Sequence, residues 1–261
     1  MKNLFIKLSL TLLLATFYAC ISNQRTENLP EDNLTAGNRL ANQLDGAWLS
    51  ENYISKIEKS KSIYANMNTD DSMLGFWLYK DTLTGKHPRL LGFSIHEGGL
   101  DAPLKYNIDK NRFENDLDLV NEFSAHKTPF FIKPVNPNKI EIQHSKPAKI
   151  ETYRKVADID SELRKVLFNG VYIDKLTNKT ITFKEDGETT GIANKHFYSL
   201  LFDFEEFHFD VVFIADTSKR DNLQEYHYKI EGNNLRLYNL NISEETGYTI
   251  GSLAYDLVKE Q

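Results

Sequence analysis

Hydrophobic and polar residues alternate in short runs along most of the chain, with the period of a half-buried β-strand. The segment 206–214 is the clearest example, because apolar side chains at every second position alternate with Glu206, His208 and Asp210. Further runs bounded by Gly, Pro or Asn predict strands at 46–48, 73–79, 89–96, 104–108, 130–134, 139–144, 148–156, 170–172, 179–184, 197–204, 226–230, 235–240 and 249–258. The pattern is therefore that of a mainly β protein.

Two short segments, 33–44 and 159–168, instead space their apolar residues as a helix does. Each is followed by a glycine and then an aromatic residue at the start of a predicted strand. These are Gly46-Ala47-Trp48 in the first half and Gly170-Val171-Tyr172 in the second. The repeat of this arrangement predicts two similar antiparallel units.

We place the first β-barrel-like unit at 34–157 and the second at 158–261. One larger barrel or sandwich is the alternative, because short motifs also recur by chance in β proteins. Two separate barrels would each have their own melting transition, whereas one continuous fold would have a single transition.

Several of these motifs together resemble the lipocalin-like lipoproteins of Bacteroidetes. They are Gly46-x-Trp48 behind a short helix, the strand at Glu151–Arg154, Gly170-x-Tyr172, and the hairpin from Tyr226 to Leu237. The resemblance implies up-and-down antiparallel barrels with a plugged base and, in many members, an apolar ligand cavity. We also expect Trp48 to be buried at the base of the first barrel, because Gly46, two residues earlier, lets the chain turn tightly. The second half departs from the family in having Tyr172 where the family has Trp.

The N-terminus has the three parts of a secretory signal peptide. Lys2 and Lys7 form a short basic region, an apolar run follows at 8–19, and Ala19 is a small residue before the expected cut. The apolar run is well short of the roughly 20 residues that a membrane-spanning helix needs. We therefore expect residues 1–19 to be a signal peptide.

Cys20 is the only cysteine in the chain, which excludes an internal disulfide and a multi-cysteine metal site. Its position behind the leader resembles the lipobox of bacterial lipoproteins, in which the cysteine is acylated. The alternatives are an ordinary signal peptide cut nearby or an uncleaved anchor. We expect a lipid on Cys20, a flexible tether over 20–33, and a place in the bacterial cell envelope, with the outer membrane favoured.

The charge balance argues against nucleic acid as a partner. The chain has 31 basic and 37 acidic residues. Removing residues 1–19 takes away two lysines and no acid, so the mature chain has 29 basic residues and a formal charge of −8. A nucleic-acid surface needs clustered Lys and Arg.

No catalytic signature is found, so we expect a protein that is not an enzyme and that holds no cofactor. Glu206, His208 and Asp210 would share one face of a strand and could ligate zinc. The favoured interpretation is that they form the solvated face of an amphipathic strand, so we expect no metal site. His227 is likewise expected to be exposed.

The strand count and the aromatic content favour a binding module for a small apolar or glycan-like ligand. Aromatic residues that could line its pocket, or belong to an ordinary core, are Trp77, Tyr79, Tyr198, Phe202 and Phe204. The alternative is a structural or protein-interaction lipoprotein with a filled interior. A pocket of several hundred cubic ångströms would favour the first hypothesis, and no individual ligand-binding residue is assigned by the sequence.

Overall fold

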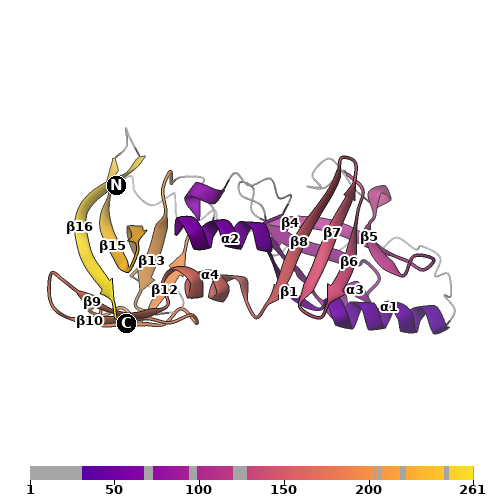
Figure 1. Cartoon of the computed structure of the whole chain (residues 1–261), viewed down its shortest axis with the longest axis horizontal. Coiled ribbons are helices and arrows are strands. Elements are labelled where there is room, and N and C mark those ends of the chain that lie inside the picture. The colour runs from indigo at the N-terminus through magenta and orange to yellow at the C-terminus, as the bar shows by residue number, and fades with distance from the viewer. Residues whose placement is uncertain are drawn as a thin grey trace, which may run out of the picture.

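The fold is mainly β, as predicted: a closed barrel of eight antiparallel strands, a second antiparallel sheet of eight strands, and a few short helices (Figure 1). The computed structural model describes residues 31–67, 73–93, 99–119, 128–202, 204, 207–217, 222–243 and 247–260. Over these residues β1 to β8 close on themselves as one barrel and β9 to β16 form a separate sheet, so the alternative of one larger barrel or sandwich is wrong. Whether the predicted unit boundaries delimit independently folding domains stays a prediction.

The first unit is an up-and-down barrel in which each strand pairs with the next and β8 returns to β1. Its elements are α1 (Glu31–Leu44), β1 (Gly46–Ser50), α2 (Glu51–Ser60), the 3-10 turn η1 (Tyr64–Asn66), β2 (Gly75–Leu78), α3 (Lys80–Leu83), β3 (Arg89–Phe93), β4 (Gly99–Asn107), β5 (Arg112–Asn115), the 3-10 turn η2 (Leu117–Leu119), β6 (Phe130–Asn136), β7 (Lys139–Ser145) and β8 (Ala148–Val156). The helix predicted over 33–44 and the strand predicted over 148–156 are both confirmed, and this strand, β8, closes the barrel against β1.

Large side chains fill the barrel. Alternate residues of each strand point inward, as in β7, where Ile140 and Ile142 are buried between more exposed neighbours. Fully buried aromatic side chains occupy the centre: Trp48, Phe76, Phe113, Phe130 and Tyr153. The interior formed by the described residues is thus a packed core.

The second unit starts with a helix and continues as an eight-stranded antiparallel sheet. Its elements are α4 (Ile159–Leu167), β9 (Gly170–Asp174), β10 (Thr180–Phe183), β11 (Thr189–Thr190), β12 (Phe197–Leu200), β13 (Val211–Ala215), β14 (Gln224–Glu231), β15 (Asn234–Ser243) and β16 (Gly247–Lys259). The strand order in the sheet is β11-β10-β9-β16-β15-β14-β13-β12, so β11 and β12 are the two end strands. An isolated bridge between Glu188, next to β11, and Phe197 of β12 brings these ends together. The sheet therefore curls into a nearly closed ring.

Both units place an aromatic side chain under the strands by the same local geometry. The Trp48 Nε1 donates a hydrogen bond to the Leu44 carbonyl at 2.8 Å, and the Tyr172 hydroxyl donates to the Phe168 carbonyl at 2.8 Å. Gly46, at a φ of +136°, makes the turn in the first unit, and a residue with a Cβ would be strained there. Trp48 is 0 % exposed, which confirms its predicted burial.

A lysine from the last strand of each unit covers that aromatic ring. The Lys155 Nζ lies 5.5 Å from the Trp48 ring, and the Lys259 Nζ lies 5.9 Å from the Tyr172 ring. These distances allow an attraction between the ammonium group and the ring. The local repeat noticed in the sequence is thus a repeat of side-chain geometry as well.

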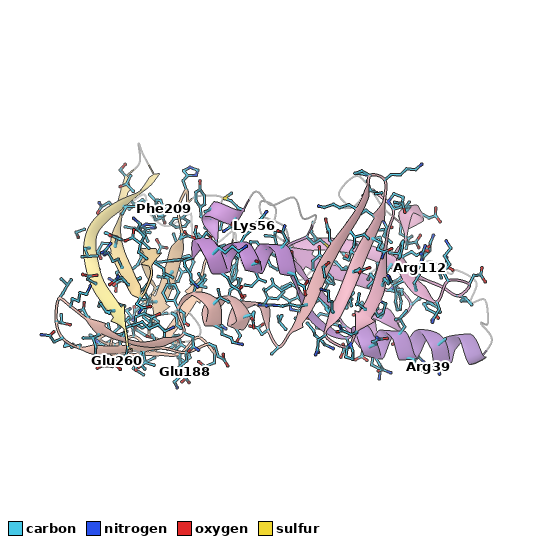
Figure 2. All side chains as sticks on the ribbon, in the orientation of Figure 1. Arg39, Lys56, Arg112, Glu188, Phe209 and Glu260 are labelled. Atoms are coloured by element: carbon cyan, nitrogen blue, oxygen red, sulfur yellow. The ribbon has the colours of Figure 1, made fainter. Side chains whose placement is uncertain are left out.

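The two units share a continuous hydrophobic core at their junction. Helix α2 leaves the barrel between β1 and β2 and buries Tyr53, Ile54 and Ile57 in the same cluster as Phe168 and Tyr228 of the second unit. Figure 1 shows α2 and α4 side by side between the barrel and the second sheet, and Figure 2 shows side chains filling the space around both helices. The two units therefore pack as one elongated body.

The observed elements depart from the predicted ones in several places. The strand predicted over 206–214 begins only at Val211, because the preceding chain turns toward the first unit, where it is anchored by Asp210. Helix α2 and strand β5 are not among the predicted elements. Ser50 caps α2 by accepting a hydrogen bond from the Tyr53 amide, a start signal that is visible in the sequence.

Among the described residues, no helix is long and apolar enough to cross a membrane.

Candidate functional site

One end of the first barrel is closed by helices and carries a pocket on its outer side. Leu40, Ala41 and Leu44 of α1 and Leu83 of α3 are buried in the barrel core together with Trp48. Beside this plug, α1, the loop from α3 to β3, and the strands β4 and β5 surround a pocket of about 350 Å³. Its lining comprises Gly37, Asn38, Leu83, Thr84, Gly85, Lys86, His87, Pro88, Leu104, Lys105, Tyr106, Phe113, Asp116 and Leu119.

The floor of this pocket, which we call the α1-end pocket, is apolar. Leu83, Leu104 and Phe113 lie there, and each is at most 3 % exposed. Tyr106 forms a wall, with its ring centroid 5.4 Å from that of Phe113. Its hydroxyl donates a hydrogen bond to the Asn111 side chain at 2.6 Å, which fixes the ring orientation.

The rim of the α1-end pocket is polar. The Lys105 ammonium lies 3.2 Å from the Asp116 carboxylate and 3.7 Å from that of Asp118. The hydrogen bond to Asp116 is the main reason that the pKa of Lys105 is raised above its ordinary value. Lys86 and His87 are exposed on the opposite loop, and their side chains have no ion pair or hydrogen bond within the described part of the chain.

Another pocket of about 350 Å³ lies at β5 and β6, and five of the eleven residues that line it are charged. Arg112 contacts Glu114 at 2.6 Å, and Lys110 lies 3.6 Å from the same carboxylate. Burial opposes ionisation of Glu114, but hydrogen bonds from Arg112 and Asn107 hold its pKa below the ordinary value. Because its acidic and basic groups already pair with each other, this pocket suits a ligand less well than the α1-end pocket.

A buried carboxylate lies near the opposite end of the barrel, on the inward face of β8. Glu151 is 3 % exposed, and its oxygens lie 2.8 Å from the Tyr153 hydroxyl, 2.8 Å from the Lys149 ammonium and 3.4 Å from the His144 Nε2. Glu151 and Tyr153 belong to a strand that the sequence predicts, but no pattern in the sequence indicates a buried ion pair there. A buried charge needs such partners to be tolerated in a core. We interpret Glu151 as a buried carboxylate whose charge is compensated by these three partners.

The residues predicted to form one solvated strand face in the second unit, Glu206, His208 and Asp210, do not form such a face where the structure describes them. His208 is exposed, as expected, but Asp210 is buried, and Glu206 lies outside the described residues. The expectation of a solvated Asp210 is wrong because 206–214 is not one regular strand, and β13 begins only at Val211. The Asp210 carboxylate instead accepts hydrogen bonds from the first unit, among them one from the Tyr64 amide at 2.8 Å.

His227 is half-buried, so the expectation that it is exposed is wrong. Its Nδ1 lies 2.9 Å from the Asp210 carbonyl oxygen, and its ring packs against Phe209 and Tyr238. Burial is the main reason that the pKa of His227 is lowered. The side chain belongs to a packed surface of the sheet and not to an open face.

The aromatic residues considered as pocket lining lie mainly at the junction of the two units. Tyr198 and Phe204 are buried in the shared core, and Trp77 and Phe202 pack against it. Tyr79 is 47 % exposed. None of the five lines the α1-end pocket. The ordinary-core interpretation therefore applies to Trp77, Tyr198, Phe202 and Phe204, but not to Tyr79.

The α1-end pocket could not have been found from a local motif, because its residues come from four separate segments. The only signal is the alternation in Leu104-Lys105-Tyr106, which predicts that Leu104 and Tyr106 share a face. Within the described residues, no group of three or more His, Cys, Asp or Glu side chains could hold a metal ion. Cys20, the candidate lipidation site, lies outside the described residues.

Comparison with known proteins adds no relative from which a role could be transferred. No protein-family model matches the sequence, and no curated protein or solved structure is significantly similar to it.

Proposed function

We propose that this protein is a cell-envelope lipoprotein, anchored through Cys20, whose first unit binds a small, partly apolar molecule in the α1-end pocket. The observation that carries the proposal is the apolar floor of a pocket of about 350 Å³. Ligand pockets typically measure about 300–1,000 Å³ and combine an apolar lining with a few polar groups. An apolar or glycan-like ligand, as the sequence favours, would rest its apolar side on Tyr106 and Phe113.

The envelope location is proposed from the leader sequence alone. The basic residues, the apolar run and Cys20 support it, and α1 follows the tether that would lead from the lipid. A flexible segment of that length spans roughly 20 Å. This distance would place the barrel close to the membrane surface without inserting it.

Native mass spectrometry of protein released from its own envelope with mild detergent tests the proposal. We expect a bound small molecule that Asn38→Trp removes, because Asn38 is an exposed residue of α1 that lines the pocket. Asn42→Trp is the matched control, since Asn42 is exposed one turn further along the same helix and outside the pocket lining. Wild-type protein without a bound molecule, or a molecule retained by both variants, would refute the proposal.

The second candidate function is a non-enzymatic structural or protein-interaction lipoprotein. The packed barrel interior favours it, since Trp48, Phe76 and Tyr153 occupy the space that a ligand inside the barrel would need. A protein partner that co-purifies in fixed stoichiometry while the α1-end pocket is empty would support this second candidate over the first.

A further inference from the structure

The residues that line the α1-end pocket carry an excess of positive charge, whereas Asp118, 3.7 Å from Lys105, is outside the lining. Lys105 and Asp116 are both in the lining, and their ion pair cancels one charge of each sign. Lys86 is then the remaining formal charge of the lining, and His87 is beside it. The rim therefore carries positive charge on the loop between α3 and β3, directly above an apolar floor.

From this arrangement we propose that the ligand of the α1-end pocket is an amphipathic anion, with an apolar body and one acidic head group. This inference rests on the proposed function and adds the chemical class of the ligand. The apolar body would lie against Leu104, Tyr106 and Phe113, where burial of apolar surface drives binding. The head group would lie beside Lys86, whose ammonium has no competing carboxylate among the described residues.

The geometry also argues against a cationic or a neutral ligand. A cation would need an acidic group facing the pocket, but Asp116 is already paired with Lys105 and is only partly accessible. A neutral apolar ligand would leave Lys86 and His87 without a role in binding. An amphipathic anion would contact both the apolar floor and the positively charged rim.

Two fluorescent probes with the same ring skeleton test the proposal. 8-Anilinonaphthalene-1-sulfonate is an amphipathic anion, and N-phenyl-1-naphthylamine is the same molecule without the sulfonate. Binding of each probe to the full-length detergent-solubilised protein is measured. The fraction bound in the pocket is the part of this binding that Asn38→Trp removes and the control Asn42→Trp retains. We expect the pocket fraction of the sulfonate to bind more tightly than that of the amine.

Lys86→Gln should weaken sulfonate binding roughly two- to fivefold, the range of an exposed charge pair, and leave amine binding unchanged. Raising the salt concentration should weaken sulfonate binding in the wild type but have little effect in Lys86→Gln, because salt screens exposed charges. Lys80→Gln is the matched control, since Lys80 is exposed, lies six positions earlier and is outside the pocket lining.

The two possible failures are distinguishable. If both probes bind in the pocket with equal affinity, or if Lys86→Gln has no effect, the anionic class is wrong and the pocket remains a binding site. If Asn38→Trp displaces neither probe, the pocket does not bind such molecules, and the proposed function fails as well.

Discussion

The carboxylate of Asp210, in the second unit, accepts a hydrogen bond from the hydroxyl of Ser62, 148 positions earlier in the first unit. The same carboxylate accepts hydrogen bonds from the Ile63 and Tyr64 amides, each at 2.8 Å, and from the Tyr228 hydroxyl at 3.2 Å. The segment after α2 is thus fixed to the second sheet by an anion that is 8 % exposed.

Asp210→Ala should lower the free energy of unfolding by about 3 kcal/mol, because hydrogen bonds to a charged acceptor contribute about 1.5–3 kcal/mol each and buried donors would be left unpaired. Asp210→Asn should cost less, since the amide oxygen can still accept from the two backbone amides. Urea unfolding of both variants measures the difference. An Asp210→Ala protein as stable as the wild type would contradict this account of the junction.

The shared core predicts that the whole chain unfolds in one transition. Tyr53 and Ile57 of the first unit belong to the same hydrophobic cluster as Phe168 of the second unit, so neither unit can unfold without exposing part of the other. Differential scanning calorimetry should show a single peak in which the calorimetric and van't Hoff enthalpies agree. Two peaks would show that the units are separate folding domains despite their contact.

Trp48→Ala should destabilise the protein by about 3–5 kcal/mol, the usual range for removing a buried aromatic side chain. Tyr172→Phe removes only the hydroxyl that bonds the Phe168 carbonyl, and should cost about 1–2 kcal/mol. Equilibrium unfolding followed by circular dichroism measures both. Equal effects of the two changes would contradict the roles assigned to these aromatic residues.

The fold was largely predictable because its strands alternate and its turns contain Gly, Pro or Asn. The helix before Gly46, the burial of Trp48 and the strand that becomes β8 all follow from local patterns. Asp210 was misjudged for a physical reason. A polar residue in a regular strand faces water, but the chain bends before β13 and brings this carboxylate to donors from the other unit.

The candidate site was not predictable in the same way. Gly37, Lys86 and the cross-strand pair Tyr106 and Phe113 line one pocket although they come from three segments that are far apart in the sequence. No spacing rule relates them, because their proximity depends on the position of α1 over the end of the barrel. Sequence patterns identify which residues are buried, but they do not identify which segments leave a cavity between them.

His227 predicts how stability changes with pH. Burial lowers its pKa below the ordinary value of 6.5, although the hydrogen bond with the Asp210 backbone opposes the shift. The His227 ring therefore takes up a proton more readily in the unfolded chain than in the folded protein. The contribution of neutral His227 to stability is fully present above pH 6.5 and is lost as the pH falls through the pKa of the ring in the folded state. Between pH 7 and 5, wild-type protein should lose stability more steeply than His227→Gln. Parallel curves for the two proteins would exclude this role.

Cys20→Ala should move the protein from the membrane fraction to a soluble fraction, because the acylated cysteine is the proposed anchor. Labelled fatty acid should be incorporated into the wild type and not into the variant. Cell fractionation and fluorography measure the two effects. Wild-type protein that is soluble and unlabelled would contradict the lipoprotein proposal.

The central claim is that a ligand occupies the α1-end pocket, and a crystal structure of protein purified from its own envelope tests it most directly. The account predicts electron density for a bound small molecule over Leu104, Tyr106 and Phe113, with an acidic group directed toward Lys86. Density for a ligand elsewhere, or only solvent over these residues, would contradict it.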